Sequence, residues 1–576
     1  MTVTVGDLNS IKNQIPFHYK YLELCESSHP KEPKKSVTDI FSNSDHKYSN
    51  YNVTINQFDQ CKISCVKNFT ETDINIFKWL VQRRYFINYF LDSLPAGLNI
   101  TSKEKNKTYL TYNQGIPIGL SRNDSIYLYN HYNLHVHLNE KNGKYQIVGF
   151  NIEPFSILQE SNEDCKTDIN YYDREIQPLK LGPIAYTYNV FFYKSNITFS
   201  SRWDYYLGSK KEIHWIGLIN ANILIFIITF LVLFILSRAI KKDIEIYNRK
   251  VLADEIIDEF GWKQVCNDVF RKPKNLMLLS SLIGTGIELF LMLLHSLIFS
   301  VLGFMSPERR GGLINLMICI FCIMGIVSGY VSSYVYKING GRDWLKCSLL
   351  TTILFPGISM IVLFIVRITF SLEQSSEGFT ISEFAVLIVL WICISTPLVL
   401  IGSFLGIRKK SIKFPCKVNV VPSIIGQKPW YLKLKYISWF TGLIPFATVF
   451  IEFIYIMATL WKHQVYFVAS FVSCAVFFIV LSSAEISIIF IYLNLCKGDY
   501  NWWWKSFFVS ASPALYIAGY SIYYFFYLDI TRFSASVVYL CLMGLVTCVV
   551  GLVCGACGVL LTFGFLYFIY SKIKID

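Results

Sequence analysis

Nine long apolar segments after residue 215 limit what this chain can fold into. A helix needs about 20 apolar residues to cross the roughly 30 Å hydrocarbon core of a bilayer. Nine segments meet this length, namely 216–237, 276–302, 313–336, 347–370, 384–407, 437–460, 465–495, 506–527 and 535–570. The last is long enough to include a cytosolic or interfacial turn. The pattern predicts a nine-helix transmembrane domain over 216–576.

Residues 1–215 contrast with this half, because they are polar and rich in Asn, Lys, Ser and Tyr. The whole chain is 53% hydrophobic and only 16% charged, which argues against a soluble enzyme and against a disordered protein. The stretch 78–98 is not a span, since charged residues interrupt it: Lys78, Arg83, Arg84 and Asp92. We therefore expect a polytopic α-helical membrane protein with an N-terminal lumenal ectodomain over 1–215.

Basic residues in the loops predict the sidedness. With the head in the lumen, the cytosolic segments hold 24 Lys or Arg and the opposing short loops hold four. This bias places the C-terminus in the cytosol. The cytosolic segments are 238–275, 337–346, 408–435, 496–505 and the short tail 571–576. The net charge of +13 follows from this topology, and nucleic acid is not an expected partner, because no motif combines basic and stacking residues.

Glycosylation signals and cysteines support a lumenal head. All six Asn-x-Ser/Thr signals precede the first span: Asn52, Asn68, Asn99, Asn106, Asn123 and Asn196. The head also holds an even number of cysteines, Cys25, Cys61, Cys65 and Cys165. Two disulfides are expected, with three possible pairings, and a zinc site is the less favoured alternative. Residues 1–10 have no basic or apolar signal region, so we expect a truncated start rather than a first span acting as a late anchor.

The region 127–154 has the alternation of a β-hairpin. Leu134, Val136 and Leu138 point to one face, and Asn142-Gly143 supplies a tight turn. We expect an antiparallel β-sandwich with a helical insertion near 71–93. Three histidines in this region, His131, His135 and His137, are candidate metal ligands. No carboxylate or cysteine pair completes a site, so we interpret them as a solvated strand face and expect no metal or cofactor.

Short motifs follow one another in a fixed order around the spans. Before and after the first span these are Ser201-Arg-Trp-Asp-Tyr-Tyr-Leu207, Ile213-His-Trp215 and Lys241-Lys-Asp243. Around the later spans they include Gly261-Trp-Lys263, Asp268-Val-Phe-Arg271, Ser306-Pro307, Pro397-Leu398, Asn419, Pro422, Pro445-Phe446, Ala484-Glu-Ile486, Asp499-Tyr500 and Trp502-Trp-Trp504. This ordered set resembles the transmembrane 9 superfamily, the EMP70-like nonaspanins. Segment 36–55 departs from the family pattern, and Glu288 stands where an amide is expected.

The resemblance implies a Golgi or endosomal protein that helps to sort other membrane proteins. The C-terminal Lys574 and Asp576 are similar to the family's terminal Lys-x-Asp signal, which implies binding to coatomer. An ammonium, a carboxylate and the terminal carboxyl at fixed spacing suit a charge-complementary pocket. Membrane-protein cargo and the lipid bilayer are the other expected partners.

Ionisable residues within the spans are candidates for function, because charges are costly in hydrocarbon. The main candidates are Glu452, Glu485 and Glu288, and His295 and Arg367 are weaker ones. One hypothesis is a proton-linked pathway between the sixth and seventh spans, and the alternative is hydrogen bonding to neighbouring helices. Replacing Glu485 by Gln tests between them.

Small and aromatic residues in the spans have structural interpretations beside functional ones. The GxxxG pairs Gly325/Gly329 and Gly551/Gly555 let helices approach closely, either within the protein or against the spans of cargo. We interpret Trp502–Trp504 as an interfacial anchor, and Cys554 and Cys557 as packing residues rather than a redox pair.

No catalytic motif is present: we find no phosphate-binding glycine loop, zinc-protease helix or nucleophile elbow. The leading hypothesis is a non-enzymatic protein that assists the localisation of membrane proteins. The alternative is a secondary transporter or channel for a small solute, which inverted repeats would favour, and no convincing internal repeat is found.

Overall fold

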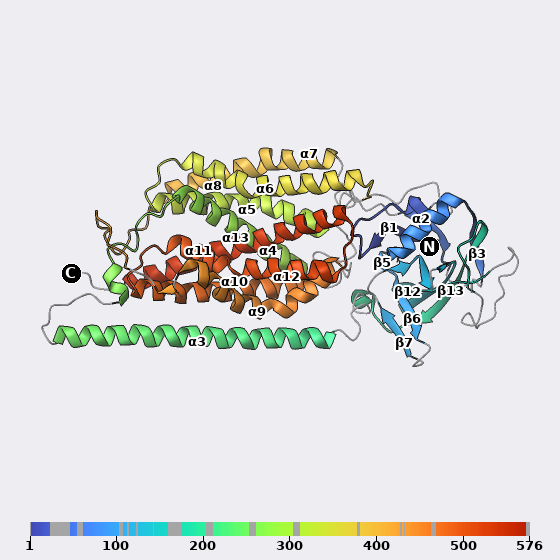
Figure 1. Ribbon diagram of the computed structural model, residues 1–576, viewed down its shortest axis with the longest axis horizontal. Helices are drawn as coiled ribbons and strands as arrows, with labels where there is room; N and C mark the ends of the chain where they lie inside the picture. Colours follow the sequence, from blue (N-terminus) through green and yellow to red (C-terminus); the bar gives the residue numbers. More distant parts are fainter. Residues whose placement is uncertain are drawn as a thin grey trace.

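The computed structural model separates a strand-rich end from a helical end (Figure 1). It describes the chain except for residue 1 and residues 23–46, 55–60, 103–106, 112–114, 123–124, 142, 159–175, 203–210, 253–260, 303–311, 377–380, 427–428, 431–432, 462–467 and 572–576. The described strands lie between Thr2 and Lys194, and the long helices begin at Lys211.

Two sheets build the head. One has the order β2-β1-β4-β5, with β8 paired to β4, and contains β1 (Thr2–Ser10), β2 (Lys47–Asn52), β4 (Tyr85–Leu91), β5 (Leu94–Pro95) and β8 (Ile116–Pro117). The other has the order β3-β13-β11-β12-β6-β7. Its strands are β3 (Lys62–Phe69), β6 (Gly97–Ser102), β7 (Lys107–Thr111), β11 (His131–Lys141), β12 (Lys144–Phe155) and β13 (Gly182–Lys194). A separate ribbon pairs β9 (Gly119–Arg122) with β10 (Ser125–Leu128).

The predicted hairpin is confirmed, because β11 and β12 are antiparallel and Lys141 is opposite Lys144. The inward-facing Leu134 and Val136 are at most 1% exposed. The prediction of a purely antiparallel sandwich is wrong, since β13 runs parallel to β11 and β6 runs parallel to β12. β12 brings the chain back to the end of the sheet at which β11 begins, since Phe155 is opposite His131, so β13 starts there and runs parallel to β11.

Tyrosine rings fill the space between the two sheets. The ring of Tyr51 on β2 makes edge-to-face contacts with Tyr89, Tyr132 and Tyr188, at centroid distances of 5.9, 5.8 and 5.2 Å. Burial raises the pKa of Tyr51 and Tyr89 well above the ordinary value. The head core is therefore built from large aromatic side chains that stay neutral.

The predicted helical insertion is shorter than expected. Helix α2 (Glu71–Gln82) begins at a capping box in which Thr70 and Asp73 exchange hydrogen bonds. Burial by itself raises the pKa of Asp73, but hydrogen bonds from Thr70 and Lys67 outweigh it and hold that pKa below its ordinary value. The helix ends by Arg83, and the following residues form β4, because their aromatic side chains are buried on both faces of the sheet.

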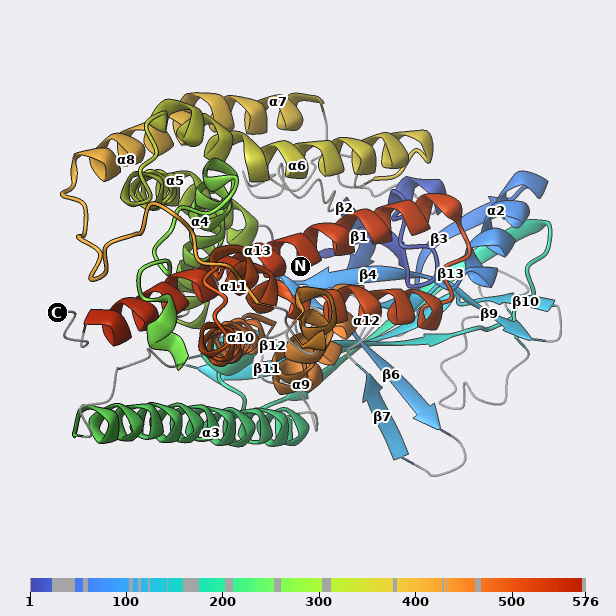
Figure 2. The same ribbon diagram turned by 60° about the vertical axis from the view of Figure 1, so that its left-hand side comes forward.

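The helical half contains eleven further α-helices in the described residues. They are α3 (Lys211–Leu252), α4 (Leu276–Val301), α5 (Gly312–Ile338), α6 (Trp344–Leu372), α7 (Ile381–Leu390), α8 (Thr396–Arg408), α9 (Leu434–Trp461), α10 (Val468–Cys496), α11 (Trp503–Ala511), α12 (Pro513–Tyr527) and α13 (Phe533–Ser571). A π-helical turn, Trp391–Ser395, joins α7 to α8. Figure 2 shows α3 along the outside of the bundle.

Among the described residues, seven helical segments are long and apolar enough to cross a membrane. They correspond to seven of the nine predicted spans. The predicted first span lies in α3, where the described apolar part is Asn222–Phe234. The predicted eighth span is divided into α11 and α12 at Pro513, which lacks a backbone N–H. The turn expected within 535–570 is absent from the described residues, since α13 is continuous.

Glycines bring α5 and α8 into backbone contact. A Cβ added to Gly329 would lie 2.0 Å from the carbonyl oxygen of Val399, and one added to Gly402 would lie 1.9 Å from that of Ile326. Gly555 likewise faces the ring of Phe507 on α11. These small residues are used for packing inside the protein, which favours the first interpretation of the GxxxG pairs.

The segment after β1 connects the head to the bundle. Lys12 Nζ lies 2.5 Å from Asp529 Oδ2 in the loop before α13. Gln14 Nε2 donates to the carbonyl oxygen of Trp461, at the end of α9, over 2.9 Å. The first strand of the head is thus followed directly by contacts to the end of α9 and to the loop before α13.

Candidate functional sites in the helical bundle

Glu288 lies in the middle of α4, which packs against α5, α6, α10 and α13. The residue is 3% exposed. Its carboxyl faces α5, because a Cβ added to Gly325 would lie 3.7 Å from Glu288 Oε1 and 3.6 Å from the carbonyl oxygen of Ser395. Oε1 has no hydrogen-bond partner within the described part of the chain. Glu288 is therefore a buried carboxyl beside a π-helical turn, a feature that is frequent at functional sites.

Glu485 on α10 is linked to the outermost helix. Thr229 Oγ1 on α3 donates to Glu485 Oε1 over 2.8 Å. The same face of α3 carries Ile225 and Val232, which are 7% and 6% exposed and pack on the bundle. The hydrogen bond therefore lies in a narrow apolar contact and fixes how α3 sits against α10.

Glu452 on α9 is 2% exposed, and neither carboxyl oxygen has a hydrogen-bond partner among the described residues. Helical rise puts it about 14 Å from the Trp461 end of α9, whereas Glu485 is about 26 Å from the Val468 end of α10. Those two helix ends flank one connection. The predicted pair of carboxyls therefore lies at two different depths, and each has its own surroundings.

Three hydroxyl groups form a buried cluster that sequence reasoning missed. Ser487 Oγ is 2.9 Å from Ser506 Oγ and 3.3 Å from Thr562 Oγ1, and Ser506 donates to Thr562 over 3.0 Å. All three side chains are fully buried, on α10, α11 and α13. The three hydroxyls hydrogen-bond to one another, so the cluster joins three helices rather than forming a binding site for a ligand. The only sequence signal was the occurrence of polar residues within apolar segments.

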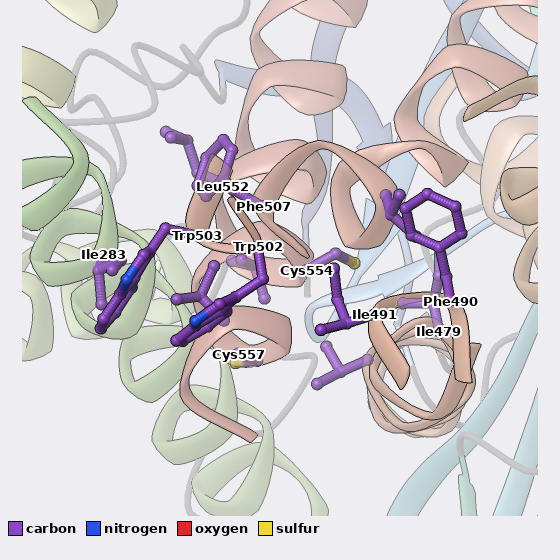
Figure 3. Packing of buried hydrophobic residues seen from close by; sticks show 14 of the residues in the cluster. Ile283, Ile479, Phe490, Ile491, Trp502, Trp503, Phe507, Leu552, Cys554 and Cys557 are labelled. Carbon is purple, nitrogen blue, oxygen red and sulfur yellow. The ribbon is translucent and has the colours of Figure 1, made fainter. Parts of the chain in front are cut away.

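Tryptophans at the end of the bundle remote from the head are packed inside the protein (Figure 3). Trp502 and Trp503 are 0% and 5% exposed. Trp502 Nε1 donates to the carbonyl oxygen of Val269 over 2.8 Å, and Trp504 Nε1 donates to that of Lys274 over 2.7 Å. The prediction of an interfacial anchor is therefore wrong for the first two, because the loop before α4 folds over them.

An acidic residue holds two loops together beside these tryptophans. Asp268 accepts hydrogen bonds from Arg271 and from the hydroxyl and backbone N–H of Ser423, and Arg271 also donates to the carbonyl oxygen of Asn419 over 2.8 Å. Burial by itself raises the pKa of Asp268, but the bonds from Ser423 and Arg271 outweigh it and hold the pKa below its ordinary value. The motif at Asp268–Arg271 and the segment around Asn419, 148 positions after Arg271, are thus bonded to each other.

A disulfide joins the same two loops, between Cys266 and Cys416. Sequence reasoning did not single out this pair. The predicted sidedness puts both loops in the cytosol, where lasting disulfides are rare. Cys554 and Cys557 are free and buried in α13, as the packing interpretation predicts.

Candidate residues of the head are spread over its surface and edges. Asn52 and Asn99 lie in β2 and β6, and Asn68 and Asn196 are exposed. Cys61 and Cys65 are both disulfide-bonded. Four further candidates, Asn106, Asn123, Cys25 and Cys165, lie outside the described residues.

The histidines of the head have hydrogen-bonding roles. The interpretation as a solvated face is wrong for His131, which is 0% exposed, with its ring nitrogens 2.8 Å from Thr187 Oγ1 and 3.1 Å from Asn133 Oδ1. His135 lies 3.7 Å from Glu153. The described residues contain no group of three side chains able to hold a metal ion.

The weaker candidates and the tail complete the set. His295 Nδ1 is 2.8 Å from the carbonyl oxygen of Leu291 in its own helix, and Arg367 is half-buried near the end of α6. Lys574 and Asp576 lie outside the described residues. The last described turn is fixed, because the Tyr570 hydroxyl donates to the carbonyl oxygen of Trp262 over 2.6 Å.

Comparison with known proteins identifies the family. Residues 16–533 match the family model described as Endomembrane protein 70. Transmembrane 9 superfamily member 10 of Arabidopsis thaliana is 31% identical, over 100% of this chain and 94% of the relative. Transmembrane 9 superfamily member 4 of Homo sapiens is 30% identical, over 99% and 93%. No solved structure matches the chain. This integral membrane protein therefore belongs to the transmembrane 9 superfamily.

Proposed function

We propose that this chain is a non-enzymatic protein of Golgi and endosomal membranes that helps to sort and localise other membrane proteins. Nine spans would put the head in the lumen and the tail in the cytosol. Family membership supports a membrane role, and the basic loops support this sidedness. The lipid bilayer, membrane-protein cargo and coatomer are the proposed partners.

The observation that carries the proposal is the fixed end of α13. Tyr570 is 1% exposed, and its ring packs edge-to-face on Trp262 at 5.2 Å. The helix ends at Ser571, at the end of the bundle away from the head (Figure 1). The tail with Lys574 and Asp576 therefore starts from a rigid point, a suitable platform for a coat-binding signal.

The test replaces Lys574 by Ala in the full chain. Removing one charged partner from a charge-complementary pocket costs about 2 kcal/mol or more, so the affinity for coatomer should fall at least about 30-fold. The protein should then move from the Golgi to the cell surface, measured by antibody binding to an epitope on the head. Lys572→Ala is the matched control and should stay in the Golgi. Unchanged Golgi residence of Lys574→Ala contradicts the proposal.

A proton-linked transporter or channel is the second candidate function, and the observation that favours it is Glu452. A buried carboxyl with two oxygens that lack partners among the described residues is costly to keep, which is typical of a functional group in a membrane. Its separation in depth from Glu485 weighs against a single shared cavity. Solute-driven proton uptake into liposomes, abolished by Glu452→Gln and by Glu485→Gln, would support transport over sorting.

A further inference from the structure

A pocket of about 450 Å³ lies where the head meets the bundle. This volume is within the range of ligand sites, about 300–1,000 Å³. Phe17, Ile76 and Trp79 line it from the head, and Glu373 and Arg532 line it from the ends of α6 and α13. The pocket is separate from the tail and from the buried carboxyls of the bundle.

Hydrogen bonds hold the two walls of this pocket together. Ser375 Oγ, just after α6, donates to the carbonyl oxygen of Pro16 over 2.7 Å. The backbone N–H of Ser376 donates to the same oxygen over 3.2 Å. The hydroxyl of Tyr21 donates to Gln374 Oε1 over 3.1 Å. The pocket is thus a fixed part of the junction.

The lining combines an apolar wall with one ion pair. Phe17 is buried, whereas Ile76 is 38% exposed. The guanidinium of Arg532 lies 5.5 Å from the centre of the Trp79 ring and pairs with Glu373, Nη2 to Oε2, at 2.9 Å. Its Nη1 is buried without a hydrogen-bond partner among the described residues, but the side chain as a whole is 37% exposed. The wall therefore suits an apolar chain, and the exposed part of Arg532 can meet an anionic oxygen.

The neighbours of the two charged residues place the pocket beside lipid. Leu372 precedes Glu373 and is 81% exposed, and Phe533 follows Arg532 and is 82% exposed. Large apolar side chains so exposed at the ends of spanning helices face the bilayer. A pocket next to them lies at the depth of lipid headgroups, where aromatic and basic residues are favoured.

We propose that this pocket binds one phospholipid of the adjacent leaflet. The phosphate lies against Arg532, and the first part of an acyl chain lies along Phe17, Ile76 and Trp79. The bound lipid then connects the head to the bundle, in addition to the direct contacts of Lys12 and Gln14.

The experiment uses the purified full chain in phosphatidylcholine vesicles containing a photoactivatable phosphatidylcholine. Crosslinks mapped by mass spectrometry should include α2 and residue 532. Ile76→Glu, which puts a carboxylate into the apolar wall, should reduce the α2 crosslinks at least about fivefold. Thr72→Glu adds the same charge elsewhere on α2 and should leave the α2 crosslinks unchanged. Crosslinks at Phe526, which is 72% exposed on α12, should be the same in all these proteins.

If Ile76→Glu melts at the same temperature as wild type, equal crosslinking of α2 in the two proteins would overturn the proposal. Competition by excess glycerophosphocholine would show that the pocket takes a soluble headgroup rather than a lipid. A peptide in place of lipid in native mass spectra of the purified protein would also overturn it. Arg532→Gln sharpens the assignment, because it should weaken phospholipid crosslinking more than crosslinking by a neutral diacylglycerol probe.

Discussion

The head and the helical bundle are packed in opposite ways. In the head, large rings such as Tyr51 and Tyr132 fill the space between two sheets, and their burial from water is the driving force. In the bundle, Gly329 and Gly402 bring helix backbones together, and hydroxyl groups such as Ser487 bond across helices. Lipid is as apolar as a leucine side chain, so close contact must replace hydrophobic burial there. One chain therefore uses two packing rules, set by the solvent around each half.

The largest expected difference between the halves is at high pH. Burial raises the pKa of Tyr51, Tyr89 and Tyr186, whereas a tyrosine in an unfolded chain ionises near about pH 10. Their contribution to stability is therefore complete below about pH 10 and is lost as pH rises above it. Circular dichroism and tyrosinate absorbance should show sheet structure disappearing as these phenols ionise. Ionisation of every tyrosine near about pH 10 with intact sheets contradicts the assignment.

Removing a ring from the head should destabilise the head alone. Tyr51→Ala should cost about 3–5 kcal/mol, as for other large aromatic truncations. Hydrogen exchange measured by mass spectrometry should rise in β1, β2 and β11 and stay unchanged in α4. Tyr51→Phe keeps the ring and serves as the control. Equal acceleration in both halves would refute the separation of the two packing rules.

Adding a single methyl group should damage the bundle. Gly402→Ala puts a Cβ against the rigid carbonyl of Ile326, and overpacking of this kind costs about 1–3 kcal/mol. The melting temperature of the purified protein should fall. Gly544→Ala is the matched control, since nothing lies within 4 Å of its added Cβ. If both variants melt alike, glycine contacts do not hold α5 against α8.

Loss of one hydrogen bond should have a smaller effect. Thr229→Val removes the bond to Glu485 while keeping the shape of the side chain, and should cost about 1–2 kcal/mol. Exchange should rise in α3 more than in α10. Thr229→Ser, which keeps the hydroxyl, should behave like wild type. If Thr229→Ser destabilises the protein as much as Thr229→Val, the shape of the side chain and not its hydrogen bond holds α3 in place.

The smallest expected effect concerns docking of the head. The hydrogen bond and charge of Lys12 hold the pKa of Asp529 below its ordinary value. The ion pair is therefore complete above about pH 4 and weakens only as pH falls below that value. Crosslinking between positions 12 and 529 should be constant from about pH 7 to about pH 5. A drop within this window would mean that another group controls docking.

The sequence predicted periodic features well and long-range contacts poorly. The β11–β12 hairpin follows from alternation and a turn at Gly143, and seven predicted spans follow from apolar length alone. The broken eighth span and the parallel strands depend on contacts that no local pattern records. Burial of Trp502 likewise requires the loop around Val269, from which it is separated by 233 positions. The surroundings of Glu485 and Glu452 depend in the same way on which helices become neighbours.

The contact between Lys12 and Asp529 joins positions 517 residues apart. During synthesis, β1 and Lys12 leave the ribosome long before the loop that contains Asp529 has been made. The head can assemble its sheets early, yet it cannot make this contact with the membrane half until the loop before α13 has been made. Seating of the head thus waits for a loop made long after the first strand, and a chain arrested before that loop would leave Lys12 without this neighbour.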